Sequence, residues 1–445
     1  MTGERYTLLG LAQVRSTWFR EAARWSTAAS LPIELVKTMS VEEVRARLRS
    51  GRAFSAFVVD DLVPGLDRDL FEEAHEAGCA VIVVDGGRTG RRWSDLDVAA
   101  VLPADFDAST LLQVLDQVAQ PVRGLATTAV AAADALSSPP SLEEPEGRLV
   151  VVTGAGGTGA STVAMAVAQH AAGSGSAVLA DLSLHAEHAV LHGTPDVVPG
   201  LSELVEAHRL GVPSSESVRA LTWQIGTRGY DLLLGLRRHR DWTALRQRAV
   251  AAALEGLRRS YDLVVADVDA DLEGERATGS LDVEERNALA RAAVGAADLV
   301  VVVGTPEMKG IHALLRVVRD VVDHGVGASR VLPLVNRAPR GPRARAELTR
   351  TIASLAGRDP RLVVDQPTHG RGALPGAVFL PDRRNLDLTI RDVAHLPDAW
   401  VRPVAAAALG LLPPSGRAEP SYELEPVPVT PGVLGAWLDE GGDDT

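Results

Sequence analysis

Short apolar runs alternate with amphipathic stretches along most of the chain. In the first quarter, the apolar runs lie at residues 7–13, 53–61, 78–85 and 98–106. Helix-like stretches lie between them, among them residues 41–50 and 69–78. Strands that alternate with helices imply a parallel sheet. We therefore predict an α/β domain over residues 1–122.

The same alternation returns after residue 147, with longer apolar runs. Five candidate strands lie at residues 148–154, 176–182, 261–269, 297–307 and 330–337. Continuous Val/Leu runs bounded by Gly or Asp are typical of strands that are covered on both faces. Long Ala/Leu/Arg stretches with a helical pattern separate most of them. The pattern predicts a second, larger α/β domain over residues 148–412 with a mostly parallel sheet.

Two segments differ in character from both domains. Residues 123–147 are rich in small residues, contain Pro and Ser, and are acidic, which is typical of a linker. Residues 413–445 are Pro-rich and acidic, and we predict a disordered tail there. Within this tail, residues 433–440 (VLGAWLDE) could form a short helix that docks on a partner.

Composition narrows the class of protein. The chain has 445 residues, of which 46% are apolar and 23% charged, so two or three globular domains are expected. No apolar run approaches the ~20 residues that span a bilayer, and the first residues do not resemble a signal peptide. Cys79 is the only cysteine, which excludes an internal disulfide and a Cys-based zinc site. We expect a cytoplasmic protein.

Net charge argues against broad binding to nucleic acid or anionic lipid. The formal net charge is −13, and the tail contributes much of it. The tail has one basic residue, Arg417, and seven acids. The acids are Glu419, Glu423, Glu425, Asp439, Glu440, Asp443 and Asp444. The sequence has only two lysines, Lys37 and Lys309, so nearly all positive charge is arginine.

The first candidate site is a glycine-rich stretch, VVTGAGGTGASTVA at residues 151–164. A strand, a Gly-rich turn and a helix that starts near Ala160 form the arrangement that binds phosphate through backbone N–H groups and the helix dipole. Gly-x-x-x-x-Gly followed by Ala160 and Ser161 matches the Walker A pattern except at its lysine. Ser161 stands where that pattern has the hydroxyl that binds Mg²⁺. The expected phosphate-contacting residues are Gly154, Gly156, Gly157, Gly159, Ala160, Ser161 and Thr162.

This stretch resembles the deviant Walker A loop of the MinD/ParA family of P-loop ATPases, which reads KGGxGKTT after a strand. The resemblance implies a three-layer α/β fold over residues 148–412. Its two lysine positions hold Ala155 and Ala160 here. Further family marks follow in order, each at the end of a predicted strand. They are Asp181, matching the acid that positions water and metal, Asp267, matching the Walker B acid and Mg²⁺ ligand, TPE at 305–307, and Asn336-Arg337, matching the pair beside the adenine.

Loss of both lysines predicts little or no hydrolysis. A lysine stabilises phosphate charge in the ground state and more strongly in the transition state. Each charge-assisted contact contributes about 1.5–3 kcal/mol of binding. We expect ATP or ADP with Mg²⁺ to bind weakly if at all, and no cofactor to be required. Two alternatives stay open, a turn without any ligand and a replacement cation from Arg237, Arg238, Arg240 or Lys309.

Residues 56–67 (AFVVDDLVPGLD) resemble the phospho-acceptor strand of response-regulator receivers. Asp60 would be the acceptor, with Pro64-Gly65 behind it. No acidic pair follows the first predicted strand, and Ala104-Asp105 stand where receivers have Lys-Pro. The resemblance therefore implies a receiver-like, flavodoxin-like domain. We expect a pseudo-receiver used for docking or dimerisation, with phosphorylation at Asp60 as the alternative.

Two other patterns suggest binding chemistry. His185, His188 and His192 have a spacing that could hold a metal, but no further ligand follows in sequence. The arginines between residues 337 and 350 could contact DNA, as in ParA relatives, but the acidity of the chain favours a solvated face. MinD relatives attach to membranes through a basic amphipathic helix at the end of the chain. This sequence has GAWLDEGGDDT there, so no direct membrane anchor is expected.

A receiver-like domain followed by a MinD/ParA-like domain with a lysine-free loop is similar to the CpaE/TadZ-like group, above all to its actinobacterial septum-site-determining (Ssd) branch. The resemblance implies a positioning or regulatory protein for the division septum or for Flp-pilus and secretion assembly. It also implies a homodimer, protein partners from those machines, and recruitment by them to membrane-associated sites or cell poles. The alternatives are a slow ATPase switch and a DNA-partitioning ATPase.

Overall fold

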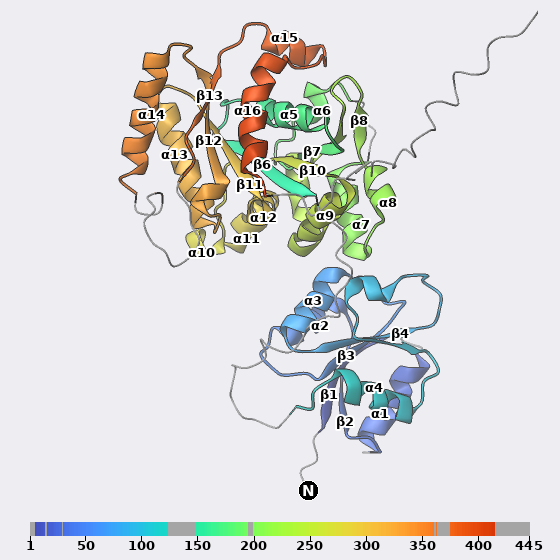
Figure 1. Cartoon of the computed structure of the whole chain (residues 1–445). Helices are drawn as coiled ribbons and strands as arrows, with labels where there is room; N and C mark the ends of the chain where they lie inside the picture. Colours follow the sequence, from blue (N-terminus) through green and yellow to red (C-terminus); the bar gives the residue numbers. More distant parts are fainter. Residues whose placement is uncertain are drawn as a thin grey trace, which may run out of the picture.

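The computed structural model describes residues 5–413, except 14–15, 29, 123–146, 195–198, 360–361 and 363–373. Two separate sheets organise these residues, one of five strands and one of eight (Figure 1). The predicted linker, apart from Gly147, and the predicted tail after Pro413 lie outside the described residues, as does the expected docking helix at 433–440.

The first sheet has the strand order β2-β1-β3-β4-β5, and all its neighbours are parallel. This is the flavodoxin-like order of doubly wound α/β folds. The strands are β1 (Tyr6–Leu11), β2 (Ile33–Thr38), β3 (Ala56–Asp60), β4 (Ala80–Asp85) and β5 (Ala100–Pro103). The four predicted strands of this half are confirmed. The sequence pattern missed β2, an edge strand whose middle residues are largely in contact with solvent.

Helices cover both faces of this sheet. They are α1 (Thr17–Thr27), α2 (Val41–Leu48), α3 (Arg68–Glu76), the 3₁₀ turn η1 (Trp93–Leu96) and α4 (Ala108–Val118). One core joins α2 and α3 to the sheet, and the other joins α1 and α4 to the opposite face. Side-chain oxygens cap three of these helices, from Ser40, Asp67 and Asp107.

The second sheet has the order β13-β12-β11-β6-β10-β7-β9-β8, and only the β8–β9 pair is antiparallel. Its strands are β6 (Arg148–Gly154), β7 (Ala177–Asp181), β8 (Trp223–Ile225), β9 (Tyr230–Leu233), β10 (Leu263–Asp267), β11 (Leu299–Gly304), β12 (Val331–Ala338) and β13 (Val378–Pro381). The five predicted strands are confirmed. They are neighbours in the middle of this sheet, in the order β12-β11-β6-β10-β7. The pattern missed β8, β9 and β13, which have three or four residues and lie toward the edges.

Helices lie on both faces of the second sheet, so this part has three layers (Figure 1). The longer helices are α5 (Ala160–Ala171), α7 (Leu201–Leu210), α9 (Gln247–Ser260), α12 (Ala288–Ala296), α13 (Met308–Asp323), α14 (Pro342–Ala356) and α16 (Asp398–Leu411). The shorter ones are α6 (His188–Leu191), α8 (Ser215–Arg219), η2 (His239–Ala244), α10 (Glu275–Thr278), α11 (Leu281–Arg286), η3 (Ala328–Arg330) and α15 (Leu386–Arg391).

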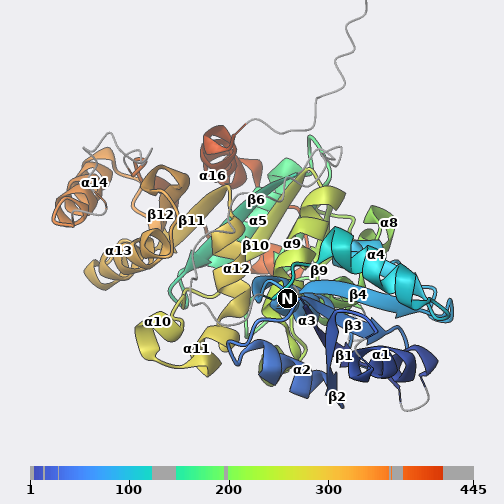
Figure 2. The same ribbon diagram turned by 90° about the horizontal axis from the view of Figure 1, so that it is seen from below.

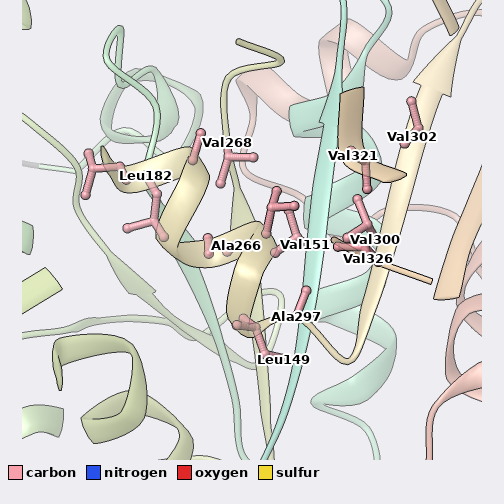
Figure 3. Packing of buried hydrophobic residues seen from close by; sticks show 14 of the residues in the cluster. Leu149, Val151, Leu182, Ala266, Val268, Ala297, Val300, Val302, Val321 and Val326 are labelled. Atoms are coloured by element: carbon pink, nitrogen blue, oxygen red, sulfur yellow. The ribbon is translucent and has the colours of Figure 1, made fainter. Parts of the chain in front are cut away.

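The central strands are apolar on both faces because each face packs against a helix layer. In β11, Val300 and Val302 belong to the core that includes α7, α9, α12 and α13, and Figure 3 shows them beside Val321 of α13. Val301 and Val303 point to the opposite core, which includes α5 and α16. Successive side chains of a strand alternate between faces, so a strand buried on both sides reads as a continuous apolar run.

Ion pairs connect the two halves where α3 and its N-cap residue Asp67 face the helices α7 and α9 (Figure 1); Figure 2 shows the same structure from below. Arg248 of α9 lies 3.3 Å from Glu72 and also pairs with Glu76. Arg209 of α7 lies 2.8 Å from Asp67. Arg91 donates to the carbonyl oxygen of Leu210 over 3.0 Å. This contact between the halves is therefore mostly charged.

Among the described helices, none combines the length and the apolar composition that crossing a membrane requires.

Candidate functional site

The glycine-rich turn joins β6 to α5, and the predicted helix start near Ala160 is confirmed. Gly157 and Gly159 have φ of 80° and 88°, which favours glycine over any L residue. A Cβ on Gly154 would lie 2.4 Å from the carbonyl oxygen of Val303, so close packing against β11 also requires glycine there. A Cβ on Gly156 or Gly157 would meet nothing within 4 Å. The outer side of the turn is therefore open.

Backbone donors at this turn suit an anion. The first helical hydrogen bond of α5 runs from the N–H of Val163 to Gly159, and no side chain caps the helix. The N–H groups of Ala160, Ser161 and Thr162 therefore precede the intrahelical ladder, at the positive end of the helix dipole. Asn336 braces the turn because its side-chain amide donates to the carbonyl oxygen of Thr158 over 2.9 Å. The residues present fit a phosphate group.

The two lysine positions of the motif hold methyl groups. Ala155 and Ala160 are both partly buried at the turn. Of the arginines considered as replacements, Arg237 pairs with Glu203 over 2.6 Å, and Arg238 and Arg240 are exposed. Lys309, near the start of α13, is exposed as well.

A cleft of about 1170 Å³ opens beside Ala155 and Gly156. Its charged lining was not predicted from the sequence. Its basic residues are Arg276, Arg291, Arg316 and His324. Its acidic residues are Asp271, Glu273, Glu275, Glu284, Asp320 and Asp323. Burial raises the pKa of Asp320, and the neighbouring Asp323 and Glu273 add to this effect against the charge of Arg316. Acids outnumber bases, so the cleft as a whole is a poor substitute for an ammonium group.

The two predicted catalytic acids lie side by side at the ends of adjacent parallel strands. Asp181 ends β7 and is the register partner of Asp267, which ends β10. They are 1% and 4% exposed, so both carboxyl groups are removed from water. Buried carboxylates need hydrogen bonds or an opposite charge.

His188 supplies both of these to the acid pair. Its Nε2 lies 2.9 Å from Oδ2 of Asp267, and its backbone N–H donates to Oδ2 of Asp181 over 3.0 Å. The imidazole is 1% exposed. Burial alone lowers the pKa of His188, but the hydrogen bond to Asp267 and the charges of Asp181 and Asp267 outweigh it, so the net shift is upward. His188 therefore lies where a cation would be expected between these carboxylates.

The pKa of Asp181 is shifted as well. Burial raises the pKa of this carboxyl most, and the charge of Asp267 adds to the rise, while His188 opposes it. The two buried acids and His188 therefore form one interacting group. The signal in the sequence was the histidine cluster immediately after the Asp181 strand, for which the only chemistry predicted was metal binding.

The three histidines of that cluster do not converge. His185 stacks near His239, with ring centroids 4.4 Å apart, at the surface. His192 donates from Nδ1 to the carbonyl oxygen of His188 over 2.8 Å and accepts from the hydroxyl of Tyr230 over 2.7 Å. Burial and the neighbouring His188 lower the pKa of His192 to about 3, in agreement with a neutral ring. In the part of the chain described, no group of three or more His, Cys, Asp or Glu side chains is arranged to hold a metal ion.

A fully buried arginine lies next to this chain of polar groups. Arg228 is 2% exposed, and its guanidinium lies 3.4 Å from the Tyr230 hydroxyl. It also donates to the carbonyl oxygens of Ala394 and Ile390, over 3.1 and 3.4 Å. Polar contacts thus run from Asp267 through His188 and Tyr230 to the segment that precedes α16.

Ser161, Thr162 and Arg337 lie around the same turn. Ser161 and Thr162 are partly buried in the first turn of α5. For Mg²⁺, the residues fit less well than for phosphate, because one oxygen of Asp267 already accepts from His188. Arg337 is exposed and has a left-handed φ of 53°. The pKa of Glu307 is lowered by a hydrogen bond from Thr305, by a hydrogen bond from the backbone of Glu307 and by the charge of Arg337.

In the first sheet, Asp60 lies at the end of β3 and accepts from the N–H of Leu62 over 3.3 Å. The structure brings it together with two acids that sequence analysis did not consider, Asp61 and Asp85. Asp61 is 5% exposed and accepts from the N–H of Gly86 over 3.2 Å. Burial raises its pKa to about 6, and the carboxyl groups of Asp85 and Asp60 contribute to the rise.

We predict that Asp61→Asn stabilises the protein, and more so at higher pH. A carboxyl whose pKa is raised on folding contributes stability below its unfolded pKa near 3.8, and this contribution is lost as the pH rises through about 6. An amide keeps the shape and donates to both neighbouring carboxylates. The gain in free energy of unfolding should be about 1–2 kcal/mol larger at pH 7.5 than at pH 4.5. Urea titrations at both pH values measure it.

Asp105→Asn is the matched control, because Asp105 is an exposed aspartate of the same half. It should leave stability unchanged at both pH values. A gain from Asp61→Asn that is equal at pH 4.5 and pH 7.5 would show that the shift in the pKa of Asp61 is not its origin.

The chain was compared with family models, with curated proteins and with solved structures. No family model matches the sequence, and no curated protein matches it. Similar solved structures include a ParA family ATPase from Chlorobium tepidum, at 14% identity and a TM-score of 0.44, over 59% of this chain and 98% of that one. A putative plasmid partition protein from Borrelia burgdorferi bound to AMPPNP has 14% identity and a TM-score of 0.42, over 60% and 98%.

The septum site-determining protein MinD from Pyrococcus horikoshii, complexed with Mg-ADP, has 18% identity and a TM-score of 0.39, over 59% of this chain and 93% of that one. These structural neighbours are MinD/ParA P-loop ATPases. The strand order of the larger sheet and the glycine turn between β6 and α5 are observed directly in the structure of this chain. The chain is a mixed α/β protein whose larger part has a mostly parallel sheet with a glycine-rich turn between β6 and α5.

Proposed function

We propose that this chain is a MinD/ParA-like positioning or regulatory protein that does not hydrolyse ATP. It keeps the phosphate-binding turn as a structural and weakly nucleotide-binding element. The observation that carries the proposal is the contact between His188 and Asp267, 2.9 Å from Nε2 to Oδ2 in a buried site. The acid proposed as Walker B ligand is engaged by a side chain of its own protein.

The two alanines support the same conclusion independently. Ala155 and Ala160 take the places of both lysines, so the turn offers backbone donors and a helix dipole but no ammonium group. Backbone donors hold a phosphate in the ground state, whereas stabilisation of the transition state needs additional positive charge. Weak binding of ATP or ADP without turnover is the expected result.

The test measures ATP binding and ATP hydrolysis by the purified chain and by Ala160→Lys. Wild type should bind ATP weakly and show no turnover above background. Lysine at position 160 should tighten ATP binding about 10- to 100-fold, because a charge-assisted contact contributes about 1.5–3 kcal/mol. Turnover should remain at background, because Ala155 and His188 are unchanged. Titration calorimetry and phosphate release measure the two quantities.

Ala172→Lys is the matched control, since it adds the same charge beyond the other end of α5, at a partly buried alanine. It should not tighten ATP binding. Turnover by wild type that disappears in Asp267→Ala would contradict the proposal and favour an ATPase.

A slow ATPase is the second candidate, favoured by the cleft beside Ala155. Arg276 and Arg316 line this cleft together with the glycine turn and could supply a replacement cation, as could a partner protein. If so, turnover should be measurable in wild type and lost in Arg276→Ala/Arg316→Ala. The six acids of the same cleft make this the weaker candidate.

The biological setting of the proposal comes from the sequence resemblance. We propose a CpaE/TadZ-like protein of the septum-site-determining branch, which forms homodimers through the glycine-turn face and acts on septum or Flp-pilus and secretion components. Those partners would recruit it to membrane-associated sites or poles. The first half would serve as a pseudo-receiver, with Asp60 unphosphorylated. Localisation of a tagged chain, with and without a charge-reversed α3, tests whether the first half directs it.

A further inference from the structure

One surface of the larger half is strongly basic. Here it is called the arginine face. It consists of the end of β12, the first turns of α14 and the turn after β13. Its seven arginines are Arg337, Arg340, Arg343, Arg345, Arg350, Arg383 and Arg384. All are exposed except Arg345, which is partly buried. Arg340 donates to the carbonyl oxygen of Asp382 over 3.3 Å, so the turn after β13 adjoins the α14 segment.

Apart from Arg337, whose charge acts on Glu307, the arginines of this face have no acid among the described residues as an electrostatic partner. Over the ranges that the structure describes, none of the seven arginines takes part in an ion pair. Arg345 and Arg350 donate instead to the carbonyl oxygens of Pro339 and Ala346. The only acids within these two segments are Glu347 and Asp382. Some surface arginines elsewhere are paired with acids, as Arg248 is with Glu72 and Glu76.

The same chain carries the complementary charge. Helix α16 ends at Leu411, and the sequence continues for 32 residues beyond Pro413. That segment holds the seven acids named above against Arg417 alone. An extended chain spans about 3.3–3.6 Å per residue, so its acids lie within about 20–110 Å of Pro413. A folded unit of this size has a radius of gyration of about 18 Å, so the acids from Asp439 on can reach any point on its surface, whereas Glu419, Glu423 and Glu425 reach only the part nearer to Pro413.

We infer that the acidic segment 414–445 binds the arginine face of its own chain. A tethered segment acts at an effective concentration in the millimolar range, which no free acidic peptide matches. Exposed ion pairs contribute only about 0–1 kcal/mol each, so binding needs several pairs, and seven arginines facing seven acids provide them. The net charge of −13 disfavours a free polyanion, whereas the attached segment has no such barrier to approach. Binding in this way shields the face from other polyanions.

The first test places two dyes on the full chain by Thr349→Cys on α14 and Gly442→Cys in the tail. The native Cys79 is 1% exposed and burial raises the pKa of its thiol to about 12, so it resists labelling. Energy transfer should be high at 50 mM NaCl and fall at least two-fold at 500 mM, as the screening length shortens from about 14 to about 4 Å. Transfer should not depend on protein concentration.

Charge-neutral variants identify the surface. Arg343→Gln/Arg350→Gln should lower the energy transfer at 50 mM NaCl at least two-fold. The matched pair Arg238→Gln/Arg240→Gln removes two exposed arginines of η2 and its flank and should leave it unchanged. Transfer that ignores salt and Arg343/Arg350, or that rises with protein concentration, would overturn the inference.

A second measurement asks what the segment shields. Full chain with all seven acids of the segment changed to their amides should bind heparin at least ten-fold more tightly at 50 mM NaCl than the unchanged chain. Adding Arg343→Gln/Arg350→Gln to that variant should remove most of the gain. Equal heparin binding with and without the seven charges would show that the segment does not cover the face. Neither measurement involves nucleotide, so its outcome is separate from that of the ATP experiments.

Discussion

His188→Ala is expected to lower the free energy of unfolding by about 3–5 kcal/mol, because it removes the imidazole that contacts the buried carboxyl group of Asp267, whereas the backbone N–H that donates to Asp181 is kept. Both carboxyl groups are buried in the folded protein, so the loss of the imidazole leaves the desolvation of Asp267 without compensation. Urea unfolding followed by circular dichroism measures the loss. Because His312 is exposed on α13, His312→Ala is the control and should change the free energy of unfolding little.

Two further measurements separate this contact from simple loss of packing. Asp267→Asn added to His188→Ala removes one uncompensated charge and should restore part of the lost stability. Millimolar Mg²⁺ should raise the melting temperature of His188→Ala and leave that of wild type unchanged, because the cation can then reach the freed carboxylates. A His188→Ala variant as stable as wild type would refute the role that we give to this histidine.

Trp400→Ala is expected to cost a comparable 3–5 kcal/mol, about the range for truncating a buried aromatic side chain to alanine. Trp400 is 2% exposed and packs in the core that holds α16 against α5, the helix that follows the glycine turn. Thermal or urea unfolding measures the loss. If α16 positions α5, nucleotide binding to the turn should weaken as well.

Trp223 provides the comparison for this variant. It lies on β8 and is 39% exposed, so Trp223→Ala removes the same atoms from a site where water already contacts them. Its cost should be well below that of Trp400→Ala. Equal losses for the two tryptophans would show that burial against α5 does not carry the effect.

The class of fold and most of the strands could be predicted from the chain alone. Runs such as LVVVVG in β11 are apolar at every position because both faces are covered, and this pattern is visible without a structure. The β2 strand could not be recognised in this way, because its edge position leaves Glu34 and Lys37 in water. Short edge strands such as β8 and β13 carry too few residues to produce a pattern.

Part of the candidate site could also be predicted from the sequence, and part of it could not. The glycine turn and the acids Asp181 and Asp267 could be located from motif spacing, because each stands at the carboxyl end of a predicted strand. Their partner, His188, could not be located in this way. His188 comes seven residues after Asp181 but 79 residues before Asp267, and only the pairing of β7 with β10 brings the three together.

By itself, the sequence determined that a glycine-rich turn follows the first strand of a parallel-stranded unit and that this turn has no lysine. These are local properties, fixed by residue type and by spacing over a few turns of chain. The tertiary structure decided what occupies the acid pair, which arginines share the cleft beside Ala155, and how α3 contacts α7 and α9. These contacts depend on strand order and helix packing, which bring together side chains that are far apart in the sequence.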